Sequence, residues 1–470
     1  MLKRRRFCSF FAILTILVYI FTLSAAAAEP PSEVLEASSA ILVNIETESV
    51  AYEYSPDLEL MPSATAKLMT AYLAYGQLKD RLDERILISE DMVEGYKNYQ
   101  SFHTGEWKSL YDYIGQRIEV SDLFELLLIS GSNDAAKALA TLSFGSESEF
   151  VLKMNEKAEE LKMSSTVYKN PTGINILGAK TTARDASKLA CAFYGNAFLV
   201  NTSSAFMSKI TVGADEVTIY NRNPIASNYY ERGYYDTEVT GIIYGASSRT
   251  DACLVTEKTA GNLSYIAVIM GADRDSALTD SEGNRKNAFT LSDELLEYGT
   301  KEFSLKCILE KHEIFASLPV KMSRQADFVT LVPRERLFAF LPKSVDIEND
   351  LDFELTVDKS SLEAPVMQGE VMGSVKVIYD GRVLGETELI TNAAASKSLL
   401  LELSDFFSRV MKNPLTIIII ILTVLGIGAF VLYRSHNEAL ILREQDEERR
   451  RREARANTEK TGENKNENSN

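Results

Sequence analysis

Hydrophobic and polar positions repeat along this chain with two different periods. Between residues 39 and 54, apolar residues cluster on either side of a Glu-Thr-Glu-Ser turn, which predicts a β-hairpin. Apolar residues spaced three and four apart predict amphipathic helices instead. We expect such helices over 67–78, over 120–142 with a break at Ser130-Gly131-Ser132, over 150–161 and over 182–194. Two strands at 252–257 and 263–270 and a helix at 281–303 follow, so this region mixes helices with strands.

The pattern changes near residue 312. Between 314 and 391, short alternating runs such as Phe-Val-Thr-Leu-Val at 328–332 are separated by Gly, Pro and Asp turns, which predicts a small all-β module. Residues 396–411 then show the spacing of an amphipathic helix. Such a helix either lies on a membrane surface or serves as a plain linker.

Two long apolar segments lie near the ends of the chain. Residues 1–28 contain a Lys-Arg-Arg-Arg cluster, an apolar run and four consecutive alanines, which is typical of a secretory signal peptide. An uncleaved membrane anchor is the alternative. Residues 415–433 carry no charge and are long enough to cross a bilayer, although a buried core helix would have the same composition. The tail, 434–470, is polar and contains Arg449-Arg450-Arg451-Arg452. Arg434 directly follows the apolar segment, so a cytoplasmic location is expected for the tail.

These segments show where the charge of the chain resides. Its 470 residues carry 67 acidic and 50 basic side chains, a formal net charge of −17. The first 28 residues contribute +4 and the tail is neutral, so residues 29–413 carry −21. Such an acidic region repels phosphates, and no nucleic-acid partner is expected.

Four short segments stand in a familiar order. They read P-S-A-T-A-K-L-M-T at 62–70, V-S-D-L-F-E-L-L-L-I-S-G-S-N-D-A-A at 120–136, K-N-P-T-G at 169–173 with T-T-A-R-D at 181–185, and C-L-V-T-E-K-T-A-G-N at 253–262. Over residues 36–303 the chain resembles the serine-type D-alanyl-D-alanine carboxypeptidases, the low-molecular-weight penicillin-binding proteins.

The resemblance implies an α+β architecture with several parts. A transpeptidase domain of the penicillin-binding-protein and β-lactamase type is expected at 29–308, after the signal peptide at 1–28. A small all-β domain at 309–395 follows. The remaining parts are an amphipathic juxtamembrane helix at 396–413, a transmembrane helix at 414–433 and a charged cytoplasmic tail at 434–470.

The chemistry of this family depends on three motifs. S-x-x-K places a nucleophilic Ser and a Lys on one helical face, where the Lys takes the Ser proton. S-x-N supplies a second hydroxyl and an amide. K-T-G on an edge strand binds the substrate carboxylate and lines the oxyanion hole.

This chain departs from the first two motifs at their serines. K-L-M-T places Lys67 on the family Lys, and the nucleophile position three residues earlier is Ala64. N-D-A-A places Asn133 on the family Asn, and the relay serine is replaced by Gly131. Alanine has no attacking atom, so an acyl-enzyme cannot form at residue 64.

The third motif is degraded as well. The resemblance places it on Ile243-Tyr244-Gly245, so Ile243 replaces the carboxylate-binding Lys and Tyr244 replaces the Thr. The resemblance therefore implies Lys67 and Asn133 as surviving catalytic positions, with Tyr244, Gly245 and Ser132 as substrate contacts.

Several other residues offer replacements for the missing groups. Ser63 lies four residues before Lys67 and could act as a shifted nucleophile, but we expect it to cap the helix N-terminus. Ser130 and Ser132 flank the vacant relay position and are expected to be loop residues. Lys-Thr-Ala-Gly at 258–261 looks like a displaced K-T-G but falls in the predicted hairpin turn. A group of tyrosines precedes the third motif and either lines the site or packs an insertion: Tyr229, Tyr230, Tyr234 and Tyr235.

Two functional hypotheses remain open. In the first, the chain is a membrane-anchored, extracytoplasmic pseudoenzyme of cell-wall biology that binds a peptidoglycan stem peptide or a cell-envelope protein. In the second, it is an active carboxypeptidase that trims muropeptides through Ser63 and Lys67. The family chemistry is metal-free, so no metal or cofactor is expected in either case.

Overall fold

The computed structural model describes residues 37–96, 107, 109–230, 233–245, 252–273, 287–412 and 414–466. These residues form two compact units. The first runs to Ile308 and also includes Leu337–Asp352, and the second contains Leu309–Arg336 and the residues from Phe353 onward. The predicted signal peptide, 1–28, and the first residues of the helix predicted at 281–303 lie outside the described part of the chain.

A five-stranded antiparallel sheet forms the centre of the first unit, in the order β2-β1-β9-β8-β7. The strands are β1 (Ser39–Asn44), β2 (Val50–Tyr54), β7 (Val239–Gly245), β8 (Ala252–Ala260) and β9 (Leu263–Ala272). The predicted hairpin at 39–54 is confirmed as β1 and β2. The turn predicted over 258–262 is shorter than expected, because β8 continues through Ala260 and leaves only Gly261 and Asn262 between the strands. Gly261 has φ +64°, the left-handed conformation that a two-residue hairpin turn needs.

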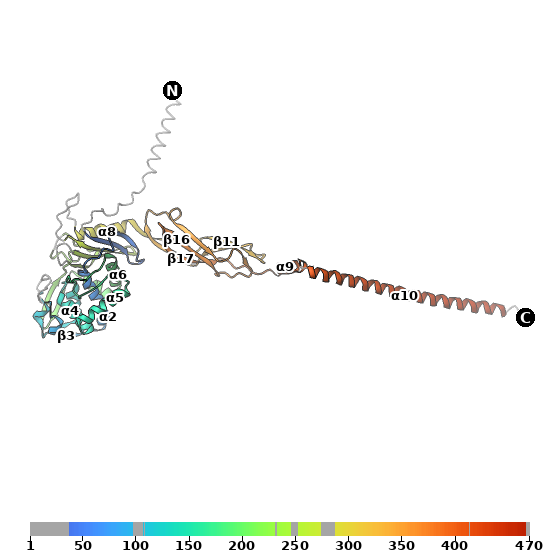
Figure 1. Cartoon of the computed structure of the whole chain (residues 1–470), viewed down its shortest axis with the longest axis horizontal. Coiled ribbons are helices and arrows are strands. Elements are labelled where there is room, and N and C mark those ends of the chain that lie inside the picture. Colours follow the sequence, from blue (N-terminus) through green and yellow to red (C-terminus); the bar gives the residue numbers. More distant parts are fainter. Residues whose placement is uncertain are drawn as a thin grey trace, which may run out of the picture. The chain divides into compact units, whose positions relative to one another are not determined.

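Helices cover both faces of this sheet (Figure 1). They are α2 (Ala64–Leu78), α3 (Val120–Leu128), α4 (Asn133–Phe144), α5 (Glu147–Glu160), α6 (Ala183–Tyr194), α7 (Ala197–Ser204) and α8 (Ala288–Glu302), with short 3₁₀ turns at Lys79–Arg81, Glu90–Met92 and Leu110–Tyr113. The predicted helices are thus confirmed, including the break after residue 129. The first of them begins three residues earlier than predicted.

Successive side chains along a strand point to opposite faces of the sheet, so the hydrophobic core has two parts, one on each face. On β1, Ile41 and Val43 point to the face that α2, α3, α4 and α6 cover, whereas Ala40 and Leu42 point to the face covered by α8. Trp107, which is only 4% exposed, belongs to the first of these clusters. A residue's register on the sheet therefore decides which set of helices it meets.

Two smaller sheets complete the first unit. One has four strands in the order β3-β4-β5-β6: β3 (Arg85–Leu87), β4 (Arg117–Glu119), β5 (Met207–Val212) and β6 (Asp215–Tyr220). The other pairs β10 (Phe303–Leu309) with β13 (Leu337–Pro342). The ring of Phe340 on β13 stacks on Phe303, with centroids 5.0 Å apart, and also approaches Tyr265.

The second unit contains most of the predicted all-β module, but the segment Leu337–Asp352 within it belongs to the first unit. The six-stranded sheet of the module has the order β14-β16-β17-β12-β11-β15. The strands are β11 (Ala316–Lys321), β12 (Phe328–Pro333), β14 (Asp352–Val357), β15 (Leu362–Glu363), β16 (Val371–Tyr379) and β17 (Arg382–Thr391).

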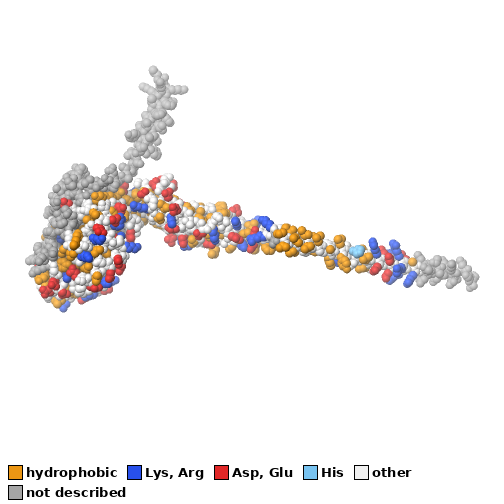
Figure 2. Space-filling model, in the orientation of Figure 1, with side chains coloured by type: hydrophobic (Ala, Val, Ile, Leu, Met, Phe, Trp, Pro, Cys, Tyr) orange, Lys and Arg blue, Asp and Glu red, His pale blue; other side chains and the backbone are white. Residues whose placement is uncertain are grey.

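Two helices follow this sheet, α9 (Leu399–Lys412) and α10 (Pro414–Asn466). Large apolar side chains of α9, among them Phe406 and Phe407, are exposed. Figure 2 shows hydrophobic side chains covering the first part of α10 and charged ones following them. Within α10, the segment Pro414–Arg455 is long and apolar enough to cross a membrane, and its most apolar stretch is not buried by other described parts of the chain.

Two helical glycines provide a test of this packing. A Cβ on Gly299 of α8 would lie 2.8 Å from Leu42 Cδ2 and 2.9 Å from Tyr265 Cδ1, whereas a Cβ on Gly76 of α2 would meet no atom within 4 Å. Gly299→Ala should lower the free energy of unfolding by about 1–3 kcal/mol through overpacking, and Gly76→Ala should raise it by about 0.5–1 kcal/mol. Urea unfolding monitored by the fluorescence of Trp107, the only tryptophan in the chain, would measure both changes. Equal effects of the two substitutions would contradict the packing described here.

Candidate functional site

The first turn of α2 carries the residues on which the candidate site is built. Ala64 is the first helical residue, and Lys67 follows it by nearly one turn. Ser63 occupies the N-cap position, but the prediction that its hydroxyl caps the helix is wrong, because it makes no side-chain capping hydrogen bond. Ser63 has φ +45°, which is unusual for a residue with a side chain. The carbonyl groups of Pro62 and Ser63 instead accept the N–H groups of Thr65 and Ala66.

The Lys-Asn-Pro-Thr-Gly segment at 169–173 holds this first turn. The Lys67 ammonium donates a hydrogen bond of 2.6 Å to the carbonyl oxygen of Thr172, and the Thr70 hydroxyl donates one of 2.7 Å to the carbonyl of Pro171. Asn170 shapes the segment, since its side-chain oxygen accepts the N–H groups of Thr172 and Gly173. Gly173 has φ +76°, and a Cβ there would lie 1.8 Å from the Ser63 carbonyl oxygen. Only glycine therefore allows the two backbones to approach this closely.

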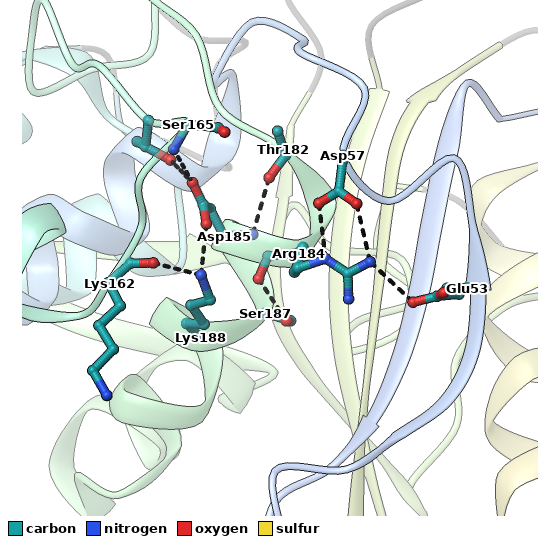
Figure 3. A network of polar contacts seen from close by, with 10 residues as sticks. Glu53, Asp57, Lys162, Ser165, Thr182, Arg184, Asp185, Ser187 and Lys188 are labelled. Carbon is teal, nitrogen blue, oxygen red and sulfur yellow. Dashed lines mark hydrogen bonds and ion pairs between the residues drawn. The ribbon is translucent and has the colours of Figure 1, made fainter. Parts of the chain in front are cut away.

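The residues before Ser63 are fixed to the start of α6. Leu60 and Thr181 exchange two backbone hydrogen bonds of 2.8 Å. The Arg184 guanidinium donates to the carboxylates of Asp57 and Glu53 (Figure 3). The backbone N–H of Arg184 donates to the Pro56 carbonyl. The guanidinium lowers the pKa of Asp57 below its usual value.

The same network fixes α6 itself. Thr182 caps this helix by accepting the N–H of Asp185. The buried Asp185 carboxylate accepts from the Ser165 N–H and the Thr166 hydroxyl and pairs with Lys188 (Figure 3). This network therefore holds residues 53–57 and 165–166, which precede the two chain segments that contact the start of α2.

The turn between α3 and α4 contributes Gly131 and Asn133. The flanking hydroxyls are used locally, because Ser130 donates to the Leu126 carbonyl at 2.6 Å and Ser132 accepts the Ala135 N–H as the N-cap of α4. Asn133 is the first residue of α4 and is buried. The prediction that both serines are loop residues is thus supported, and the Ser132 hydroxyl is engaged as the N-cap of α4.

Arg222 brings a second cation to the site. A Cβ on Gly131, which has φ +66°, would lie 3.2 Å from Arg222 Nη1. The Arg222 N–H donates to the carbonyl of Ile129. The neighbouring Asn221 is buried and donates to the carbonyls of Ser203 and Ala205. The backbone around Arg222 is therefore rigidly held beside the position of the lost relay serine.

The pKa of Lys67 is lowered to about 7. Burial is the main cause, because it removes water from the charged ammonium, and repulsion by Arg222 adds to it. Lys67 is accordingly half protonated near neutral pH. A lysine in this state can accept a proton, or it can carry a charge that depends on pH.

The end of β7 closes the site on the other side. A Cβ on Gly245 would lie 3.1 Å from the Ala64 methyl carbon, so strand end and helix start are in contact. Ile243 is buried in the same core cluster as Ala64. The Tyr244 ring points to the opposite face, where it lies 4.9 Å from Phe289 of α8. Ile243, and not a cation, therefore lies two residues before Gly245 in the core cluster that contains Ala64.

The structure thus brings together most of the residues singled out in the sequence. Ala64, Lys67, Gly131 and Gly245 surround one place, and α4, which begins with Asn133, packs against α2. Tyr244 lies on the other face of the sheet, and Lys-Thr-Ala-Gly at 258–261 lies at the far end of β8. Sequence reasoning missed Arg222 and the Thr172 carbonyl. The Tyr-Asn-Arg-Asn segment at 220–223 was the only available signal for Arg222.

The arrangement has a proton acceptor and a cation but no nucleophile at residue 64. Within the described ranges, no three His, Cys, Asp or Glu side chains lie close enough together to hold a metal ion. Lys67 and Arg222 give the site positive charge, which can bind an anion.

Comparison with known proteins identifies the family. Residues 24–274 match the D-alanyl-D-alanine carboxypeptidase family, and residues 303–397 match the C-terminal domain of penicillin-binding protein 5. The chain is 26% identical to the D-alanyl-D-alanine carboxypeptidase DacF of Bacillus subtilis, an alignment covering 77% of this chain and 87% of DacF. It is 25% identical to DacC of Escherichia coli, over 79% of this chain and 88% of DacC.

Solved structures agree on the fold. Penicillin binding protein 5 of Haemophilus influenzae aligns with a TM-score of 0.56 at 20% identity, covering 79% of this chain and all of that one. Because the family match spans more than half of the sequence and the alignments cover most of its relatives, this chain belongs to the D-alanyl-D-alanine carboxypeptidase family of penicillin-binding proteins.

Proposed function

We propose that this chain is a catalytically inactive family member that binds the stem peptide of peptidoglycan. The observation that carries the proposal is the start of α2, where Ala64 occupies the first helical position in contact with Gly245, three residues before Lys67. The surroundings of a nucleophile are retained, but the attacking oxygen is absent. Binding can continue in such a site without bond cleavage.

Two cations support a ligand with a terminal carboxylate. Lys67 and Arg222 are close enough for the charge of one to lower the pKa of the other. An anionic group between two cations relieves their repulsion, and charge-assisted hydrogen bonds are stronger than neutral ones. Arg222 would thereby take over part of the role lost with the Lys-to-Ile change at residue 243.

The location we propose follows from the two ends of the chain. A signal peptide at 1–28 would export the first unit, and α10 would anchor the chain from 414–433 with its tail, 434–470, in the cytoplasm. The length and composition of α10 support this anchor. We further infer a family domain at 29–308 and a β domain at 309–395, from which the segment Leu337–Asp352 returns to the first compact unit. Residues 396–413 would lie at the membrane surface.

One observation favours the alternative of an active carboxypeptidase. A lysine with a pKa of about 7 is suited to act as a general base, and Ser63 lies one residue before the usual nucleophile position. Against this, Ser63 is buried outside the helix at an unusual backbone angle, and catalysis tolerates little displacement of the attacking atom.

A β-lactam distinguishes these functions. Incubation of the full-length protein with a fluorescent penicillin should leave its intact mass unchanged, because residue 64, three positions before Lys67, is an alanine and has no oxygen to acylate. Ser63→Ala serves as the matched control and should behave identically. A stoichiometric adduct that disappears in Ser63→Ala would establish the alternative function.

Restoring the nucleophile alone should not restore catalysis. We expect Ala64→Ser to release D-alanine from an acyl-D-alanyl-D-alanine peptide no faster than the unmodified chain, since Ile243 offers no charge and Gly131 no hydroxyl. Adding Gly131→Ser is expected to fail as well, because residue 131 has φ +66° and a Cβ there crowds Arg222. Rapid D-alanine release by the single variant would contradict this prediction and show that the changes at Gly131 and Ile243 do not limit catalysis.

Peptide binding should depend on pH through Lys67. The ammonium is protonated below its pKa of about 7 and neutral above it, so affinity for a D-alanyl-D-alanine-terminated peptide should fall as pH rises through 7. Calorimetry should show roughly three- to tenfold tighter binding at pH 6 than at pH 8. Lys67→Met should remove this dependence, and Arg222→Ala should weaken binding at both values. Equal pH dependence in Lys67→Met would exclude Lys67 as the cause.

A further inference from the structure

Five aromatic side chains form a continuous surface on the first unit, which we call the aromatic platform: Phe206, Tyr220, Tyr229, Tyr230 and Tyr235. Tyr229 stacks on Tyr220, with ring centroids 3.7 Å apart and planes 6° apart, and meets Tyr230 edge-on at 4.8 Å. Phe206 contacts both Tyr220 and Tyr235 at 6.4 and 5.8 Å. Each ring thus fixes the orientation of the next.

The platform is exposed although it is aromatic. Phe206, Tyr229, Tyr230 and Tyr235 each leave between 36 and 50% of their surface in solvent. Tyr234, in the same segment, is packed against the core by contrast: its ring contacts Phe289, and its hydroxyl accepts a hydrogen bond from Asn287. The platform rings have no such place in the core. Exposed aromatic clusters of this kind mark binding surfaces.

The composition of the platform favours a neutral ligand with both apolar and polar groups. Residues 205–208, 219–220 and 227–230, which carry four of the rings, contain no charged side chain. Aromatic faces are electron-rich and attract the weakly positive C–H groups of a sugar ring, and tyrosine hydroxyls can hydrogen-bond its hydroxyl and amide groups.

The size of the platform also argues for a small repeating ligand. With 150–250 Å² per aromatic side chain, the exposed parts add up to roughly 400 Å². A stable protein interface needs about 800 Å² from each partner, so the platform is about half as large as a protein partner would require. Two or three sugar rings fit such an area.

The platform is continuous with the candidate site. Tyr220 ends β6, and Arg222, whose guanidinium lies beside Gly131, follows two residues later. The N–H of the intervening Asn221 donates to the carbonyl of Phe206. A ligand that extended from Arg222 toward β6 would therefore meet the platform at Tyr220, two residues away along the chain.

We propose that the aromatic platform binds a glycan chain of β-linked N-acetylhexosamines by stacking its rings on Tyr229 and its neighbours. This inference rests on the proposed function in one respect. The candidate site is proposed to bind the stem peptide of peptidoglycan, and the platform would bind the glycan part of the same polymer. Peptide and sugar bind separate groups of residues.

Chitohexaose, a soluble β-1,4-linked N-acetylglucosamine chain, is a suitable probe. Calorimetry and saturation-transfer NMR with the full-length protein in detergent should detect binding, with the largest transfer to the C–H groups on the faces of the sugar rings. Tyr229→Ala and Tyr235→Ala should each weaken binding at least tenfold. Tyr229→Phe retains the ring and should stay within about threefold. Phe328→Ala, which removes an exposed ring of the second unit, should have no effect.

The outcomes separate the two proposals. Absence of chitohexaose binding, or unchanged binding in the Tyr229→Ala/Tyr235→Ala double variant with normal thermal unfolding, overturns the platform and leaves the peptide site untouched. Loss of peptide binding in Arg222→Ala with intact chitohexaose binding supports two separate surfaces. Sugar binding by a protein that binds no D-alanyl-D-alanine peptide would overturn the proposed peptide function alone. If Tyr229→Ala fails to fold, the comparison of Tyr235→Ala with Tyr229→Phe decides the question.

Discussion

Close backbone contact at the start of α2 is the constraint on which the rest of the site depends. The Ser63 carbonyl lies against Gly173 on one side, and Ala64 lies against Gly245 on the other. Neither glycine leaves room for a side chain without displacement of its neighbour. The position of the helix start is therefore set by main-chain packing, and it does not require a catalytic hydroxyl.

This independence explains how a family fold can persist without its nucleophile. Ala64 is part of the hydrophobic core, and its methyl group packs against strand β7. Loss of a hydroxyl at that place removes no hydrogen bond that the fold needs. Lys67 is different, because its ammonium is anchored on the Thr172 carbonyl, and a buried lysine without such a partner would destabilise the protein.

The sequence predicted the architecture well because its signals are local. Helical spacing, the break after residue 129 and the hairpin turn at 46–49 depend on neighbours along the chain. The site was only partly predictable, since it depends on contacts between distant segments. Arg222 lies about 90 residues from Gly131, the acceptor of Lys67 is a backbone carbonyl, and the positive φ of Ser63 is imposed by surroundings that no short motif records.

The pairing of β10 with β13 has a consequence for how the chain can be divided. Leu337–Asp352 belongs to the first compact unit, so the polypeptide passes between the two units three times. A protein shortened at residue 308 would lose Phe340, and the ring faces of Phe303 and Tyr265 that it covers would meet water. The two family matches are separate in sequence, at 24–274 and 303–397. The first compact unit can nevertheless complete its folding only after the ribosome has synthesised residues 337–352, which lie within the second match.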